Sequence, residues 1–261
     1  MLDPARALCR RLDIEDPRFI EIESKRKVRD GDAEGLREHL FHLKGVRHVR
    51  EAVFFDQYLD TPDLALLRKG ASLRLRYKGD GTFVYLQYKG PGFLQDGLLW
   101  RSEFSSDRLA RVVREESPHD VVHFADVSIP DILARHADPA MAGAMERHLG
   151  NRTLERIRRG VILALYRKDK FKVKLGRSAF LEPSLDRIFA FHIVPDGLHP
   201  LSTFWEYENE IKSKDEDILE KLSRTEALLA FDRRLSKRFR LRPERLDKYR
   251  RCASCFLKLQ G

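Results

Sequence analysis

Charged and apolar residues alternate in the segment FIEIESKRKV, residues 19–28, near the start of the chain. Because successive side chains of a β-strand point to opposite faces, a strand here would carry Glu21, Glu23, Lys25 and Lys27 on one face. Paired carboxylates suit Mg²⁺ or Mn²⁺, which take oxygen ligands. If this face pointed inward, the protein would have a charged interior, and the cost of burying charge would need a functional reason.

The same alternation recurs in later segments, and in each of them the charged residues share one face of the expected strand: Arg74, Arg76 and Lys78 in 71–78, Lys89 in 82–90, Arg101 and Glu103 in 99–105, and Glu206, Glu208, Glu210 and Lys212 in 204–213. Arginine binds phosphate oxygens through two nitrogens, and lysine binds them as a point charge. Acidic strands that face basic strands would therefore suit a divalent metal bound to a polyphosphate.

Two architectures would place these strands. One is an open antiparallel sheet with a wet face, and the other is a closed barrel with a polar lumen and no edge strands. Further strands are expected at 161–175 and 183–194, and helical patterns lie between or after the strands at 32–43, 106–116, 129–149, 214–231 and 242–259. A lumen rich in Arg and Lys would be stable only if a polyanion or opposite charges compensated them.

Composition sets outer bounds on the function. The chain has 261 residues, 42% of them hydrophobic, which is enough for one substantial domain, and we treat residues 1–261 as a single domain. The formal net charge of +9 suits anionic partners. Three cysteines argue against a disulfide framework, and no segment has the pattern of a signal peptide or a membrane span, so we expect a cytoplasmic protein.

Several spaced motifs carry a resemblance to a known family. Residues 21–25 have the pattern ExExK, and the segment YLDTPDLALLRKGASLRLRYKGDGTFVYLQYKGP, residues 58–91, runs from a DTP turn through a paired-arginine strand to a KGP strand. PSLDRI, EYENEIKSKDEDILEKL and LDKYRR follow in order along the chain. Together they resemble the triphosphate tunnel metalloenzymes, or CYTH superfamily, over a core of about residues 18–250.

The resemblance implies an α+β fold, with an eight-stranded antiparallel β-barrel tunnel and helices packed outside. Carried over by position, it implies metal ligation by Glu21, Glu23, Glu206 and Glu208, with Mg²⁺ or Mn²⁺ as the cofactor. It implies phosphate binding by Lys25, Arg74, Arg76, Lys89, Arg167 and Lys248, of which Arg167 is the choice for the basic residue of the second half. Lys25, Arg76 and Glu103 would be the catalytic residues, and Asp186 matches a motif position of less clear role.

The function that follows is metal-dependent hydrolysis of a triphosphate, with inorganic triphosphate as the default substrate and diphosphate and phosphate as products. Polyphosphate polymerase and class IV-type adenylyl cyclase share the site and differ in the nucleophile. A non-catalytic module that binds polyphosphate or RNA ends is the remaining alternative, although a pure anion binder gains nothing from four carboxylates near phosphate. Nucleic acid would enter only as a 5′-triphosphate end, and the protein would be a monomer or a homodimer.

Overall fold

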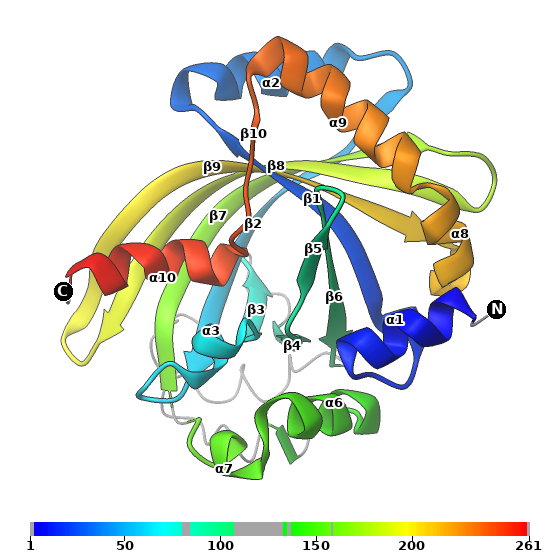
Figure 1. The fold of residues 1–261 in the computed structure, drawn as a ribbon. Coiled ribbons are helices and arrows are strands. Elements are labelled where there is room, and N and C mark those ends of the chain that lie inside the picture. The colour runs from blue at the N-terminus through cyan, green and yellow to red at the C-terminus, as the bar shows by residue number, and fades with distance from the viewer. Residues whose placement is uncertain (1–2, 80–83, 107–132, 135–136, 158, 260–261) are drawn as a thin grey trace.

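An antiparallel sheet closed into a ring forms the centre of the computed structural model, which describes residues 3–79, 84–106, 133–134, 137–157 and 159–259 (Figure 1). Eight strands follow one another around the ring in the order β1-β9-β8-β7-β2-β3-β4-β6, and β6 pairs again with β1. The strands of the ring are β1 (Ile20–Val28), β2 (Val46–Asp60), β3 (Ser72–Lys78), β4 (Val84–Lys89), β6 (Leu98–Ser105), β7 (Arg159–Lys174), β8 (Ala179–Val194) and β9 (Gly197–Ser213).

The ring closes unevenly at β1. One edge of β1 pairs with β9 from Glu23 to Val28, whereas β6 pairs with the other edge only from Ile20 to Glu23. The short strand β10 (Arg242–Pro243) pairs with β1 at Arg26 and Lys27. The remaining strand, β5 (Phe93–Gln95), lies against β6. The alternation read from the sequence thus gives a closed ring rather than an open sheet.

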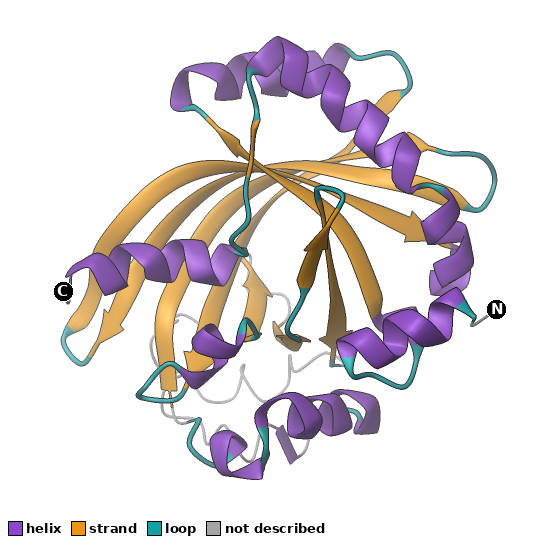
Figure 2. Cartoon of the chain, in the orientation of Figure 1, coloured by secondary structure: helices purple, strands orange, loops and turns teal. Residues whose placement is uncertain are grey.

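Most helices pack on the outer face of the ring, and the main apolar core lies between the two layers (Figure 2). Outward residues of β1 such as Ile20 and Ile22 are buried there with Leu36 of α2 and Leu228 of α9. The helices are α1 (Pro4–Leu12), α2 (Asp30–His42), α3 (Ala65–Lys69), α6 (Pro139–Leu149), α7 (Asn151–Leu154), α8 (Ile218–Ser223), α9 (Thr225–Phe239) and α10 (Lys248–Leu259), with 3₁₀ turns at Pro17–Phe19 and Lys214–Glu216.

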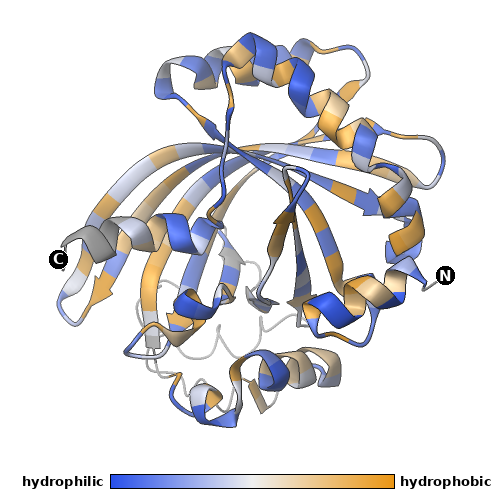
Figure 3. Ribbon diagram, in the orientation of Figure 1, coloured by the Kyte–Doolittle hydropathy of each residue, from blue (hydrophilic) through white to orange (hydrophobic). Residues whose placement is uncertain are grey.

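Helix α10 departs from the expected outside packing. It lies under the concave side of the long strands β7, β8 and β9 (Figure 1), where Tyr249 and Cys252 form a second core with Ile162, Ala164 and Ile188. These strand positions are apolar, so this end of the inner face accepts a helix, whereas the charged positions further along do not. Figure 3 shows the alternation of hydrophilic and hydrophobic residues along the strands.

Other sequence expectations are met in part. The expected helix at 106–116 lies almost wholly outside the described residues. Of the one expected at 129–149, the second half forms α6, which Asp138 caps by accepting a hydrogen bond from the Met141 amide, whereas residues 137–138 are not helical. The helical pattern at 214–231 becomes α8 and a longer α9, separated at Arg224. The pattern at 242–259 begins as β10 before α10 starts.

The buried carboxylate of Asp60 joins three elements at the end of β2. Its oxygens accept hydrogen bonds from the backbone amides of Thr61, Leu66 and Leu67 at 2.7–3.0 Å and from the hydroxyl of Tyr249 at 2.8 Å. It therefore holds the first turn of α3 and the start of α10 against the ring.

We expect Asp60→Ala to lower the free energy of unfolding by about 3–5 kcal/mol, because several buried donors lose their acceptor. Urea denaturation followed by circular dichroism would measure the loss. The exposed Asp63, three residues on, is the matched control, and Asp63→Ala should change stability far less. Equal losses for the two variants would contradict the anchoring role of Asp60.

Candidate active site in the tunnel

The inner face of the ring encloses a cavity of about 580 Å³ that is lined by residues of all eight strands. Charged side chains dominate the lining because inward positions alternate with outward ones along each strand. The predicted site residues that line it are Glu21, Glu23, Lys25, Arg74, Arg76, Lys89, Glu103, Glu208 and Lys248. Of the charged face of residues 19–28, Glu21, Glu23 and Lys25 therefore point inward, whereas the side chain of Lys27 is 53% exposed and lies 3.4 Å from Glu244.

Cations and carboxylates alternate around the junction of β1, β4 and β6. Lys89 Nζ donates to both oxygens of Glu21, at 2.7 and 2.8 Å, and lies 2.8 Å from Glu103 Oε2. Arg101 bridges the two acids of β1, with Nε donating to Glu21 and Nη2 to Glu23. Burial alone would raise the pKa of Glu21, but the charges of Lys89 and Arg101 outweigh it and hold this pKa well below its usual value.

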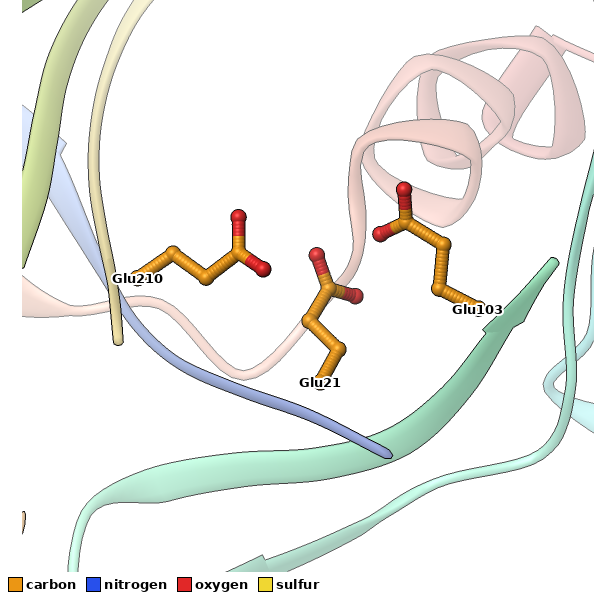
Figure 4. Close-up of side chains that lie close together, drawn as sticks. All are labelled: Glu21, Glu103 and Glu210. Carbon is orange, nitrogen blue, oxygen red and sulfur yellow. The ribbon is translucent and has the colours of Figure 1, made fainter. Parts of the chain in front are cut away.

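Three carboxylates from three strands converge at this junction (Figure 4). Glu21 of β1, Glu103 of β6 and Glu210 of β9 each place one oxygen within 4.8 Å of the others. Burial, opposed by Lys212 and reinforced by Glu21 and Glu103, raises the pKa of Glu210 to about 8. A divalent cation would offset the repulsion that keeps Glu210 from ionising beside the other two carboxylates. The three residues offer only oxygen ligands, which fit Mg²⁺ or Mn²⁺.

Lysines form a second charged group toward α10. Lys25 Nζ donates to Glu208 at 2.6 Å, and Lys168 and Lys248 lie 3.2 and 3.5 Å from the same carboxylate. Lys248 also lies 2.5 Å from Asp186. Burial would raise the pKa of Glu208, yet these lysines hold it well below its usual value. Three ammonium groups lie together here, and phosphate oxygens would suit them as partners in place of Glu208 and Asp186.

The paired arginines of β3 are fixed by a buried acid. Arg76 Nε donates to Asp56 Oδ1 at 2.6 Å, and Arg74 Nη1 donates to Asp56 Oδ2 at 2.8 Å. Burial opposes ionisation of Asp56, but the two guanidinium charges lower its pKa to about 2. Gln87 accepts from Arg74, and the Tyr166 hydroxyl contacts Arg76. Both guanidinium groups are thereby held in place facing the cavity.

Two predicted residues lie elsewhere. Glu206 is fully buried outside the lining, 3.7 Å from Lys25 and 3.3 Å from Arg251, and burial, with Lys25 opposing it, raises its pKa to about 7. Its place in the acidic group is taken by Glu210, which pairs in register with Glu23. Arg167 projects from the outer face of β7, where its side chain is 52% exposed and Nη2 lies 2.6 Å from Glu51.

The expected tunnel position of Arg167 is therefore wrong, and its neighbours Lys168 and Lys170 line the cavity. Period-two spacing carried the signal, because lysines occupy every second position from 168 to 174. The sequence prediction placed Arg101 on a charged strand face but gave it no role, and it omitted Asp56. These residues hold the acids of β1 and the arginines of β3.

The CYTH domain family model matches residues 20–239. The chain belongs to the CYTH domain family. The matched residues run from β1 to the end of α9 and so include all eight strands of the ring. No curated protein sequence matches the chain significantly.

Solved structures share the CYTH fold. The chain resembles the Hippeastrum protein HpAC1, proposed as an adenylyl cyclase and reported to have a dominant triphosphatase activity, with a TM-score of 0.58 and 16% identity over 90% of this chain and 95% of that one. A proposed adenylate cyclase from Bacillus halodurans has a TM-score of 0.51 and 14% identity over 88% of this chain and 96% of that one. At these identities the likeness establishes the fold alone.

None of the helices in the described part of this CYTH protein has the length and apolar character needed to cross a bilayer.

The raised pKa of Glu210 predicts a pH-dependent effect of Glu210→Gln. Between pH 4.5, the ordinary pKa of a glutamate side chain, and about pH 8, the folded protein keeps a proton on Glu210 that the unfolded chain has lost, so folding becomes less favourable as pH rises through this window. Without divalent metal, Glu210→Gln should match the wild type near pH 4.5 and exceed its unfolding free energy by on the order of 3 kcal/mol at pH 8.

Urea titrations of both proteins in EDTA, from pH 4.5 to 8, would measure this difference. Glu182→Gln is a control, because the pKa of Glu182, which pairs with Lys170, is lowered even though burial acts to raise it. A gap between Glu210→Gln and wild type that does not grow with pH would contradict the raised pKa of Glu210.

Proposed function

We propose that this CYTH protein hydrolyses inorganic triphosphate, with Mg²⁺ or Mn²⁺, to diphosphate and phosphate inside the tunnel. The observation that carries the proposal is the meeting of the three carboxylates with tunnel cations drawn from β1, β3, β4 and β7. A site for anions alone would not concentrate carboxylates where phosphate binds, whereas a metal–triphosphate complex needs both signs of charge.

The acidic residues of the cavity would have two roles, metal binding and the positioning of cations. Glu21, Glu103 and Glu210 would hold a divalent ion, which, when bound, supplies positive charge to the phosphate oxygens. On the acidic side, Glu23 stays paired with Arg101 and fixes that guanidinium. Glu206 and Glu208 would position Lys25 and Lys248 rather than bind metal.

The basic residues would bind the triphosphate and stabilise the charge that develops during reaction. Arg74 and Arg76 present fixed guanidinium groups, while Lys25, Lys168 and Lys248 present ammonium groups on the neighbouring wall. In the reaction a water oxygen bonds to the terminal phosphorus, the bridging P–O bond breaks, and diphosphate leaves. Glu103, the most exposed of the three clustered acids at 23%, would orient the water and take its proton.

Phosphate release from inorganic triphosphate, ATP, thiamine triphosphate and a 5′-triphosphorylated RNA, each with Mg²⁺, Mn²⁺ or EDTA, tests the proposal. Release from inorganic triphosphate that requires metal and is lost in Glu103→Gln is the expected result. Tight binding of triphosphate without release of phosphate would contradict the proposed hydrolase activity. Formation of cyclic AMP from ATP, or of chains longer than the substrate, would identify the cyclase or the polymerase instead.

Neighbouring residues of β7 and β3 provide a matched comparison. Arg76→Ala and Lys168→Ala, both within the tunnel, should lower kcat by on the order of 10²–10³-fold, because each removes a positive charge facing the developing negative charge. Arg167→Ala removes an equal charge from the outer face one residue away and should leave kcat unchanged. Steady-state phosphate assays, with circular dichroism as a check on folding, would measure this. Equal losses in Arg167→Ala and Lys168→Ala would contradict the assignment of the inner face.

A further inference from the structure

A buried acid lies on the opposite side of the tunnel wall from the candidate site. Asp232 belongs to α9, which packs on the outer face of β9 and β1 (Figure 1), and its side chain is fully buried. The neighbouring buried positions of α9 are apolar, namely Leu228, Phe231 and Leu235. A carboxylate in this setting is costly unless its partners compensate for the water that it has lost.

The partners of Asp232 come from both strands. On β1, Ser24 Oγ donates to Oδ2, and Arg26 Nη2 lies 3.6 Å from the same oxygen. On β9, the Tyr207 hydroxyl and Asn209 Nδ2 donate to Oδ1 at 3.0 and 2.9 Å. Each oxygen thus serves one strand, and the carboxylate joins the two.

These partners alternate with the candidate site residues. Ser24 pairs in register with Asn209, and Arg26 with Tyr207, so the carboxylate spans two cross-strand pairs. On the inner face the interleaved pairs are Glu23 with Glu210 and Lys25 with Glu208. If β1 shifted along β9, the side chains of these two pairs on the inner face would move relative to each other.

We infer that Asp232 is a positioning residue that fixes β1 against β9 and thereby sets the spacing of Glu21 and Glu210 for a divalent ion. The inference rests on the proposed function in that it takes these acids as metal ligands. Groups that hydrogen-bond to metal ligands contribute 10–100-fold to metal affinity in other proteins, and Asp232 would act on the ligands indirectly, through the strands that carry them. Burial raises the pKa of Asp232 while Ser24 opposes the rise, and the four partners supply the contacts that an acid in this place requires.

Mn²⁺ affinity of the substrate-free protein, measured by electron paramagnetic resonance or calorimetry, tests the inference. Asp232→Ala should weaken Mn²⁺ binding about 10–100-fold and Ser24→Ala by a smaller factor, and the double variant should match Asp232→Ala because Ser24 acts through the carboxylate. Asp232→Asn keeps the shape of the side chain but has one acceptor oxygen for two strands, so its Mn²⁺ affinity should fall between those of the wild type and Asp232→Ala. It replaces Asp232→Ala in the test if that variant does not fold.

Leu235→Ala is the matched control, because it leaves a cavity on the same buried face of α9 without touching the carboxylate. It should lower the melting temperature without changing Mn²⁺ affinity in the folded protein. Wild-type affinity in both Asp232→Asn and Ser24→Ala, or an equal loss of affinity in Leu235→Ala, would overturn the inference while leaving the proposed function intact. Absence of Mn²⁺ binding by the substrate-free wild type would overturn the inference, and it would overturn the proposed function as well if phosphate release from triphosphate also fails to require metal.

Discussion

Charge neutrality inside a closed ring of strands is the constraint on which the rest of the structure depends. Isolated charges in this interior would be prohibitively costly, and the lining meets that cost by placing nearly every cation against a carboxylate, as with Lys89 and Glu21 or Arg76 and Asp56. In the proposed function the protein's own pairs are exchanged. A divalent ion would bind carboxylates that now pair with lysine or arginine, and a triphosphate would bind the cations thus released. The two ligands would therefore favour each other's binding.

Contacts outside the cavity lining hold the strands that carry these charges. Asp232 joins β1 to β9 on the outer face, Asp60 fastens α10 and α3 to the end of β2, and α10 brings Lys248 to the inner face. The wall is therefore two-sided, with apolar and hydrogen-bonded contacts outside and ion pairs inside. Rigid strands supported in this way hold charged side chains more firmly than loops would.

Period-two alternation made the charged inner faces of β1, β3, β4, β6 and β9 predictable from the sequence, because facing direction is a local property of a strand. Register is not local. Whether Glu206 or Glu210 joins Glu21 depends on the pairing of Glu23 with Glu210, which a distant segment decides. On β7 the choice of Arg167 over Lys168 was an error of parity that local spacing could have prevented. Strand β2 went unpredicted because the charges in its first half do not alternate regularly.

The closure of the ring at β1 has a consequence for how the chain reaches its native state. Residues Glu23–Val28 of β1 pair with β9, which lies far along the sequence, and Arg26 and Lys27 pair with β10, which follows later still. These edges of β1 therefore stay unpaired until those segments have been made. Such distant contacts slow folding, because a large loop must close before any pairing energy is gained. During synthesis β1 leaves the ribosome long before its partner, and the charges that later face the tunnel would keep this unpaired strand hydrated and discourage its association with other chains.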